Sequence, residues 1–269
     1  MRIASALRGR ARLPGAGVVD PDRCLVLVCQ VPDGPAPGHL GLLPGTATRD
    51  GQPSRAGPLV NYRWAVATRV AGILLAAGDG SRLGQPKATV ELAGSTLAER
   101  GVELLRDGGT DPVIVVTGAV PVELPGVVSV HNPDWLTGMG SSLATGLRAL
   151  EGGATAAVIA LADQPLVGAE AVRRLIAAHA GGATVAVAAY DGKPRNPVLI
   201  DRIHWPAVIE LATGDAGARP FLRAHPDLVT LVECADTGSP ADIDTPEDLA
   251  QAQATAAGSQ GASQGGEGS

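Results

Sequence analysis

The sequence has very few aromatic side chains, and this limits the kind of core that it can build. Phe, Trp and Tyr together make up 2% of its 269 residues, whereas hydrophobic residues make up 45%. The core therefore has to be assembled from Ala, Val, Leu and Ile. Buried aliphatic strands covered by Ala-rich helices meet that requirement, and a chain of this length can bury a sizeable core in one large or two small domains.

The sequence also lacks the features of several protein classes. Its 21 basic and 27 acidic side chains give a net charge of −6, without a basic run interleaved with aromatics, so we do not expect a nucleic-acid surface. Cys24, Cys29 and Cys234 form neither a metal-binding spacing nor an even disulfide framework. The apolar stretches are shorter than the roughly 20 residues that span a bilayer, and none follows the N-terminal arginines as in a secretory signal. We therefore expect a cytoplasmic protein.

Composition divides the chain into three parts. Residues 1–68 are rich in Pro, Gly and Arg and show no sustained helical or strand period, which predicts a poorly structured N-terminal extension. Residues 254–269 form a Gly/Ser/Gln/Ala tract that has too little apolar surface to fold, which predicts a disordered tail. Residues 69–253 are left as the folded domain.

Strand-like and helix-like segments alternate within residues 69–253. Five aliphatic runs predict strands: Val70–Ala77, Val113–Thr117, Ala156–Ala162, Thr184–Ala189 and Val229–Val232. Apolar residues at helical spacing lie between them, for example Val172, Leu175 and Ile176. This alternation predicts an α/β fold with a mostly parallel sheet. Ligands of such sheets bind beyond the carboxyl ends of the strands.

A glycine-rich turn follows the first predicted strand, and its residues suit the binding of phosphate. Gly78 and Gly80 allow positive φ and a close backbone approach to a ligand, and the exposed N–H groups of such a turn bind anions. Arg82 and Lys87 add two cations. The turn lacks the Gly-Lys-Ser/Thr of a Walker A loop and misses the Gly-x-Gly-x-x-Gly spacing of a dinucleotide site by one residue. A glycine turn with two solvated cations is the alternative interpretation.

The same turn resembles a known family signature. The segment Leu75–Lys87 is similar to the Leu-Ala-Ala/Gly-Gly-x-x-x-Arg-x-Gly-x-Pro-Lys pattern of nucleotidyltransferases that build activated cofactors and sugars, and most similar to the molybdenum-cofactor nucleotidyltransferases. The resemblance implies a three-layer αβα, Rossmann-like fold of the nucleotide-diphospho-sugar transferase type. It implies that Arg82 and Lys87 are catalytic, with Lys87 stabilising charge that develops at the α-phosphate. The implied NTP-binding residues are Leu75, Ala76, Ala77, Gly78, Gly80, Ser81, Arg82 and Lys87.

Two carboxylates are candidates for binding a magnesium ion. Asp163 ends a predicted buried strand, at the edge of the sheet where a ligand would lie. Asp244 precedes Thr245, the predicted N-cap of a helix whose capping box is completed by Asp248. Asp163 could instead cap a helix or turn, Asp244 could complement the helix dipole, and Asp242 is the alternative second ligand. The Ala-Asp-Gln-Pro and Asp-Thr-Pro-Glu-Asp-Leu segments resemble metal motifs of the family, which implies that Asp163 and Asp244 hold Mg²⁺.

A second glycine-containing segment begins a predicted helix. In Gly138–Leu143, small residues and two hydroxyls are suited to capping the helix and also to hydrogen bonding with a ribose or base edge. The segment resembles the nucleotide pocket of the cytidylyltransferase branch. This resemblance implies that Gly140, Ser141 and Ser142 bind the nucleotide.

A third segment is a candidate for binding the acceptor substrate. On composition alone, Gly214–Arg219 is a surface turn, but it resembles the family's Gly-Asp-x-Gly-Ala-Arg element, which faces the acceptor. This implies that Asp215 and Arg219 recognise a pterin or its phosphate. Asn196 is the third acceptor-binding candidate, and it stands where relatives usually carry a histidine. Unlike histidine, it cannot titrate near neutral pH.

Together these motifs predict a nucleotidyltransferase. The resemblance implies transfer of a nucleotidyl group from an NTP, preferably CTP, to molybdopterin or the molybdenum cofactor, with Mg²⁺ as cofactor and release of pyrophosphate. Ala77 is the cue for CTP, because GTP-using relatives tend to carry a second glycine there. A molybdenum hydroxylase is the expected transient partner. The alternatives are a GTP-using or sugar-phosphate nucleotidyltransferase of the same fold, and a non-catalytic factor that inserts the cofactor into such a hydroxylase.

Overall fold

The structure is a computed structural model that describes residues 69–150 and 153–263. The predicted N-terminal extension, residues 1–68, lies outside the described residues. The strands of the described part are β1 (Val70–Ala76), β2 (Glu91–Leu92), β3 (Ser95–Thr96), β4 (Val113–Thr117), β5 (Val128–His131), β6 (Ala156–Leu161), β7 (Val185–Tyr190), β8 (Lys193–Asp201) and β9 (Val229–Glu233). The α-helices are α1 (Leu97–Asp107), α2 (Met139–Ala149), α3 (Ala169–Ala180), α4 (Trp205–Leu211), α5 (Arg219–Ala224) and α6 (Pro246–Ser263).

Seven of these strands form one sheet in the order β5-β4-β1-β6-β8-β7-β9. Neighbouring strands are parallel except where β8 runs against β6 and β7. The central strands β1, β4 and β6 are buried along their whole length, as expected for parallel strands that are covered on both faces. The prediction of a mostly parallel sheet is confirmed.

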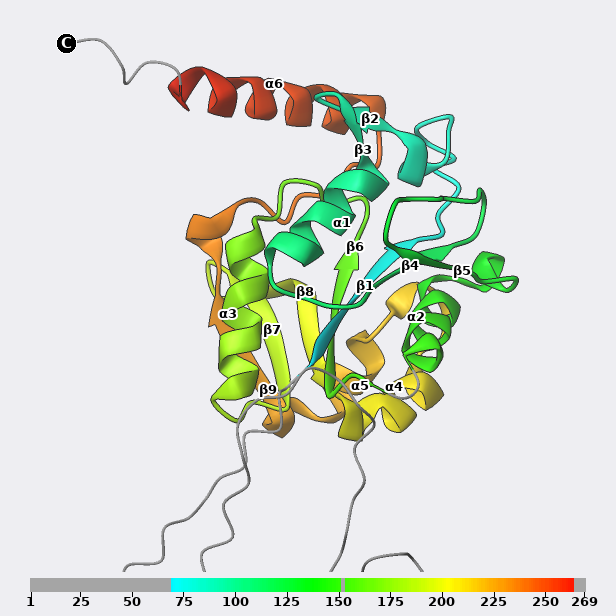
Figure 1. Cartoon of the computed structure of the whole chain (residues 1–269), viewed down its shortest axis with the longest axis vertical. Helices are drawn as coiled ribbons and strands as arrows, with labels where there is room; N and C mark the ends of the chain where they lie inside the picture. Colours follow the sequence, from blue (N-terminus) through cyan, green and yellow to red (C-terminus); the bar gives the residue numbers. More distant parts are fainter. Residues whose placement is uncertain (1–68, 151–152, 264–269) are drawn as a thin grey trace, which may run out of the picture. The chain divides into compact units, whose positions relative to one another are not determined.

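Helices cover both faces of this sheet (Figure 1). One apolar cluster joins the sheet to α1 and α3, through residues such as Val102 and Leu175. A second cluster joins the opposite face to α2, α4 and α5, through Leu147, Val208 and Phe221. The arrangement is the predicted three-layer αβα fold. It leaves the carboxyl ends of β1 and β6 at one edge of the sheet, where the predicted ligand-binding residues follow.

Two strands of the sheet, β5 and β8, are absent from the sequence-based prediction. Pro194 and Pro197 argue against a central strand, because proline cannot donate a ladder hydrogen bond, yet β8 lies between β6 and β7. The pairing of β7 with β8 shifts register between Val187 and Ala189, and β8 pairs with β6 only from Val198 onward. Pro197 therefore lies where the β7–β8 ladder is interrupted, and Pro194, although paired with Ala189 of β7, lies outside the part of β8 that pairs with β6.

The C-terminal helix begins as predicted but continues further than predicted. Thr245 and Asp248 form the expected capping box, in which the Thr245 N–H donates to the Asp248 carboxylate (2.9 Å) and the Asp248 N–H donates to the Thr245 hydroxyl (3.2 Å). The helix then runs to Ser263, so the prediction that the chain is unstructured from residue 254 is wrong up to that residue. The alanines and glutamines after Asp248 are good helix formers. Ala252 is buried, whereas the three residues that follow it are exposed.

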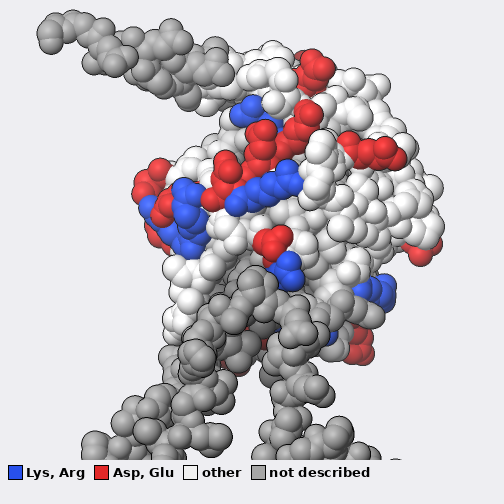
Figure 2. Space-filling model, viewed as in Figure 1, with Lys and Arg blue, Asp and Glu red and all other residues white. Residues whose placement is uncertain are grey.

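The face of the described domain seen in Figure 2 carries charges of both signs. On α3, for example, Arg174 forms ion pairs with Glu170 and with Asp236. None of the helices in residues 69–150 and 153–263 is long and apolar enough to cross a membrane.

Candidate active site

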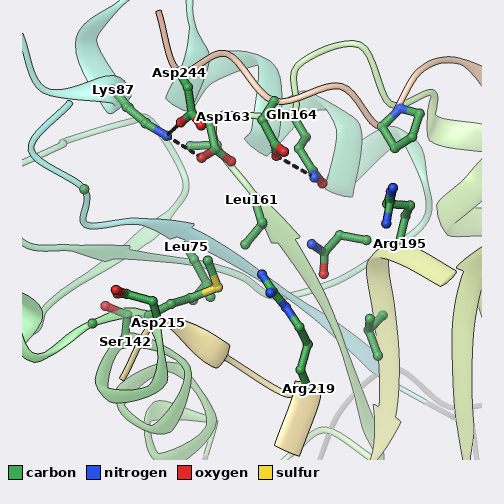
Figure 3. A pocket seen from close by; sticks show the side chains of 18 of the residues that line it. Leu75, Lys87, Ser142, Leu161, Asp163, Gln164, Arg195, Asp215, Arg219 and Asp244 are labelled. Carbon is green, nitrogen blue, oxygen red and sulfur yellow. Dashed lines mark hydrogen bonds and ion pairs between the residues drawn. The ribbon is translucent and has the colours of Figure 1, made fainter. Parts of the chain in front are cut away.

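A cavity of about 1580 Å³ opens where β1 and β6 end (Figure 3). Its wall includes the glycine turn after β1, the start of α2, the first part of β8, helix α5 and the segment before α6. Typical small-molecule pockets measure about 300–1,000 Å³. The cavity is therefore large enough for two substrates side by side.

The glycine turn forms one end of the cavity. All the predicted NTP-binding residues between Leu75 and Lys87 line it. Gly80 has a φ of +62°, and a side chain there would collide with the Gln85 carbonyl oxygen, so only glycine fits. The Leu83 N–H closes the turn on the Gly80 carbonyl (2.8 Å). Gly78 does not have positive φ, which corrects that expectation. The nearest neighbour of an added Cβ at Gly78 is the stem of Lys87, at 3.9 Å.

Lys87 joins this turn to the two predicted metal-binding carboxylates. Its Nζ donates to Asp163 Oδ2 (2.7 Å) and also to Asp244 Oδ1 (Figure 3). The side chains of Lys87 and Asp163 are each only 19% exposed, and that of Asp244 is 31% exposed. We call Lys87, Asp163 and Asp244 the lysine–carboxylate cluster. Arg82 adds an exposed ion pair to the other oxygen of Asp244, at 3.1 Å.

A small apolar cluster brings these three distant segments together. Ile243 is buried beside Val90 and Leu92, and Leu83 of the glycine turn and Leu166 of the segment after β6 pack against the same cluster. The Ile243 N–H donates to the Asp163 carbonyl oxygen (2.8 Å). The capping box of α6 then fixes the next residue, because Asp248 also accepts from the Asp244 N–H (3.1 Å). Asp244 is thereby held beside Asp163.

Burial and ion pairing set the charges of the cluster. Burial raises the pKa of Asp163, and the nearby Asp242 and Asp244 carboxylates act in the same direction, although Lys87 opposes them. The hydrogen bond from Lys87 lowers the pKa of Asp244. Burial disfavours the Lys87 ammonium, but the two carboxylates outweigh burial and raise the pKa of Lys87. The cluster is thus one positive charge between two carboxylates.

The donor set of the cluster fits a hard divalent ion. Asp163 Oδ1 is buried and has no hydrogen-bond partner within residues 69–150 and 153–263, and such an oxygen is costly unless a ligand satisfies it. Among the described residues, no group of three or more His, Cys, Asp or Glu side chains is arranged so that it could hold a metal ion without other ligands. Two carboxylates suit Mg²⁺, which shares its shell with water and substrate phosphates.

Asp242, the alternative second ligand, has a different partner. It accepts a hydrogen bond from Gln164 Nε2 (2.8 Å), and no ion pair joins it to Lys87 in the described part of the chain. The other side-chain atom of Gln164, Oε1, is buried without a partner among the described residues. The geometry thus places Asp244 rather than Asp242 on Lys87 together with Asp163.

The start of α2 contributes only part of what the sequence predicted. Ser142 lines the cavity, but Gly140 and Ser141 do not. Gly140 packs against the 212–213 backbone, since an added Cβ would lie 2.6 Å from the Ala212 carbonyl carbon. The Ser141 hydroxyl is held by the Asn132 side chain (2.9 Å) and by the carbonyls of Asp134 and Gly138 (2.9 Å each). Both residues have structural partners that the motif did not reveal.

All three predicted acceptor-binding residues line the cavity, but they do not form one group. Asp215 lies against the loop that begins α2, because an added Cβ at Gly138 would be 2.6 Å from Asp215 Oδ1. It is therefore near Ser142, on the side predicted for the nucleotide. Arg219 extends from α5 toward the middle of the cavity (Figure 3). Asn196 belongs to β8 and lines the same cavity.

Sequence analysis missed two further arginines of the wall, Arg195 and Arg223. The sequence could have indicated both residues. Arg223 follows Arg219 by one helical turn and so lies on the same side of the helix, and Arg195 is the neighbour of the predicted residue Asn196. We call Arg195, Arg219 and Arg223 the arginine wall. In contrast to Lys87, none of the three forms an ion pair with a carboxylate of the described residues.

Comparison with known proteins places this geometry in a family. Residues 72–229 match the model of the MobA-like NTP transferase domain. Among curated proteins, nicotine blue oxidoreductase of Paenarthrobacter nicotinovorans is 40% identical over 194 residues, which are 67% of this chain and 94% of that protein. Purine catabolism protein PucB of Bacillus subtilis (strain 168) is 30% identical over 192 residues, covering 66% of this chain and 92% of PucB. A molybdenum cofactor guanylyltransferase of Xanthomonas euvesicatoria is 38% identical over 108 residues, 39% of this chain and 53% of that enzyme.

Solved structures agree with these matches. A Mycobacterium sp. strain JC1 homologue of Rv0371c aligns with a TM-score of 0.61 and 33% identity, over 70% of this chain and 97% of that chain. A manganese complex of Rv0371c from Mycobacterium tuberculosis aligns with a TM-score of 0.57 and 25% identity, over 70% of this chain and 100% of that chain. Since the family model spans more than half of the sequence and a relative matched over 94% of its length is 40% identical, the chain belongs to the MobA-like NTP transferase family, a family of nucleotidyltransferases.

Proposed function

We propose that residues 69–253 transfer a nucleotidyl group from an NTP, preferably CTP, to the phosphate of a molybdopterin-type cofactor and release pyrophosphate. The observation that carries this proposal is the lysine–carboxylate cluster, which brings Lys87, Asp163 and Asp244 together beside the glycine turn. Buried charges are costly, and this cluster lies on the wall of the cavity rather than inside an apolar cluster. Its place at the mouth of the sheet fits the reaction centre of a nucleotidyltransferase.

The reaction needs positioning and charge neutralisation rather than a protein nucleophile. A phosphate oxygen of the acceptor attacks the α-phosphorus of the NTP, and the bond to the bridging oxygen breaks, so that pyrophosphate leaves with that oxygen. The N–H groups of the glycine turn and the Arg82 guanidinium bind the triphosphate. Lys87 stabilises the charge that develops at the α-phosphate. Mg²⁺, held by Asp163 and Asp244, supplies further neutralisation of phosphate charge when it is bound.

Three observations support the choice of substrates. Arg219 and the rest of the arginine wall offer unpaired cations to a phosphorylated acceptor. The similarity to a molybdenum cofactor guanylyltransferase supports a molybdopterin-type acceptor. Ala77, which lines the cavity, favours CTP over GTP by its resemblance to the cytidylyltransferase branch. A molybdenum hydroxylase is the proposed recipient of the product.

One relative supports a second candidate function. The 40% identical protein is named nicotine blue oxidoreductase, so this chain is also a candidate oxidoreductase of nicotine blue or a similar compound. The cavity is large enough for such a compound. An oxidoreductase function, however, leaves the lysine–carboxylate cluster unexplained. We therefore rank this function second.

Pyrophosphate release tests the two candidates together. The protein is incubated with Mg²⁺, the molybdenum cofactor and CTP, GTP, UTP or ATP in turn, and Asp163→Asn serves as the inactive control. We expect CTP to give the fastest release and the variant to give almost none. A parallel assay follows bleaching of nicotine blue by reduced nicotinamide nucleotides. Absence of pyrophosphate with all four nucleotides would overturn the transferase proposal, and dye bleaching in the same preparation would support the oxidoreductase.

A further inference from the structure

Lys87 occupies the oxygens that a divalent ion would need. Its ammonium contacts Asp163 Oδ2 and Asp244 Oδ1 at the same time, and these two carboxylates are the proposed metal ligands. Mg²⁺ binds carboxylate oxygens at about 2.0–2.1 Å and demands nearly ideal octahedral geometry. An ion in that position would replace the ammonium, since the two cations cannot share these oxygens.

The remaining oxygens of the two carboxylates are not equally available. Arg82 Nη2 lies 3.1 Å from Asp244 Oδ2, although the Arg82 side chain is 68% exposed and easily displaced. Asp163 Oδ1 is buried without a partner among the described residues. A metal ion that arrives alone therefore meets one buried carboxylate oxygen without a partner among the described residues and a partly buried positive charge.

The Lys87 side chain is able to move between the carboxylates and the triphosphate. Its stem runs beside Gly78, since an added Cβ there would be 3.9 Å from Lys87 Cδ. The four-carbon stem is flexible and its ammonium is a compact point charge. The glycine turn and the carboxylates line one cavity, so the ammonium can change partner without a change in the backbone (Figure 3).

We propose that Lys87 is a built-in counter-ion that competes with the divalent ion for Asp163 and Asp244, and that the triphosphate relieves this competition by binding the ammonium. The inference rests on the proposed function, in which the same cavity binds a metal ion and an NTP. Metal and nucleotide then bind cooperatively, and each raises the affinity of the other by the same factor.

Binding of Mn²⁺ to the nucleotide-free protein tests the competition without turnover. The EPR signal of free Mn²⁺ gives its dissociation constant for the wild type and for Lys87→Met. We expect the variant to bind Mn²⁺ more tightly by on the order of tenfold to a hundredfold, within the usual range of coupling between sites. Two control variants also lose one positive charge. Arg82→Met loses the exposed partner of Asp244, and Lys193→Met makes the same substitution outside the cavity. We expect about a threefold change or less in each.

Chemical reactivity of Lys87 in the wild type tests the exchange directly, so the proposal does not depend on a variant that folds. Acylating reagents need access to a free amine, whereas the Lys87 side chain is only 19% exposed and its Nζ contacts both Asp163 and Asp244. Mass spectrometry of the labelled peptides gives the Lys87 labelling rate, with Lys193 as internal reference. We expect slow labelling in the free protein, faster labelling with saturating Mn²⁺, and slow labelling again when inorganic tripolyphosphate is added.

The outcomes separate this inference from the proposed function. Equal Mn²⁺ affinities of the wild type and Lys87→Met would overturn the competition, and so would an equal gain in Arg82→Met, because net charge alone would then explain the effect. Lys87 labelling that ignores Mn²⁺ would overturn it as well. If both measurements give the expected result while no nucleotide releases pyrophosphate, the competition stands and only the transferase proposal fails.

Discussion

The two ends of the cavity carry their positive charges in different ways. In the lysine–carboxylate cluster, Lys87 is largely buried and contacts two carboxylates. In the arginine wall, Arg195, Arg219 and Arg223 are exposed and have no carboxylate partner among the described residues. A buried charge needs a partner before any ligand arrives, whereas an exposed one is stabilised by water. The lysine–carboxylate cluster is therefore preorganised, whereas the arginine wall is free to pair with an anionic ligand.

This contrast predicts which substitutions affect chemistry and which affect binding. A change in the lysine–carboxylate cluster alters the groups proposed to meet the reacting phosphate, so the rate should fall. A change in the arginine wall alters the groups proposed to hold the acceptor, so the acceptor KM should rise while the nucleotide KM stays the same. Four substitutions test or sharpen this division.

The largest effect is expected at Asp163. Asp163→Asn keeps the shape of the side chain but removes the charge that balances Lys87 and would bind the metal ion. We expect kcat for pyrophosphate release to fall by about 10²–10³, the scale of losing one electrostatic group at a reaction centre. Asp242→Asn is the matched control, since Asp242 lines the same cavity but pairs with Gln164. If both variants lose activity equally, the assignment of Asp163 and Asp244 as the pair is wrong.

Substitution of Gly140, at the start of α2, should lower the stability of the fold. Gly140→Ala places a Cβ 2.6 Å from the Ala212 carbonyl carbon and 2.7 Å from the Thr213 nitrogen, in the segment that leads to Asp215 and Arg219. Overpacking of this kind costs about 1–3 kcal/mol in the free energy of unfolding, which denaturant titration measures. Gly153→Ala is the control, because an added Cβ there meets nothing within 4 Å. Equal stability of the two variants would contradict the packing role of Gly140.

Arg219 should affect binding of one substrate only. Arg219→Gln removes from the cavity a guanidinium that forms no ion pair within residues 69–150 and 153–263. We expect the acceptor KM to rise about tenfold, equivalent to roughly 1.4 kcal/mol of lost binding, while the CTP KM changes by less than about twofold. Arg173→Gln, on the outer surface of α3, is the control. Steady-state kinetics with each substrate varied in turn gives both constants. A rise in the CTP KM instead would move Arg219 to the nucleotide side, where the structure already places Asp215.

Local sequence predicted the parts of the fold and site that depend on short segments. The runs of β1, β4 and β6 are strands because a parallel strand covered on both faces buries consecutive positions, here seven, five and six of them. The capping box of α6 is also a local feature, and Thr245 and Asp248 pair as expected. The turn at Gly80 requires glycine because a side chain there would collide with the Gln85 carbonyl oxygen, only five residues later in the chain.

Features that depend on distant segments were not predictable in this way. The sequence around Asp242 and Asp244 does not say which carboxylate meets Lys87, because Ile243 is anchored to a segment about 80 residues earlier. The motif around Gly140 and Ser141 looks like a ligand loop, but its neighbours at Ala212 and Asn132 decide its role. Strand β8 was hidden by prolines that only the register shift with β7 makes tolerable.

The smallest expected effect tests how Asp244 is held in place. The Asp248 carboxylate accepts hydrogen bonds from the Asp244 and Thr245 N–H groups, and these bonds lower the pKa of Asp248 below its ordinary 3.8. A carboxyl group with a lowered pKa in the folded state stabilises the fold above its ordinary pKa, and this contribution is lost as the pH falls through the lowered value. Asp248→Asn should therefore lower Tm by about 2 °C or less at pH 7. The difference from the wild type should shrink as the pH falls below 3.8.

The control for this last prediction is Glu247→Gln, because it removes a carboxylate from the same helical turn without removing a capping hydrogen bond. A Tm difference in Asp248→Asn that persists at pH 3, or that Glu247→Gln reproduces, would show that the capping charge contributes nothing. The same substitution should affect only one end of the cavity. Asp248 fixes the backbone of Asp244 and does not belong to α5, which carries Arg219 and Arg223. Asp248→Asn should therefore weaken Mn²⁺ binding slightly and leave the acceptor KM unchanged. If the acceptor KM moved instead, the two ends of the cavity would not be independent.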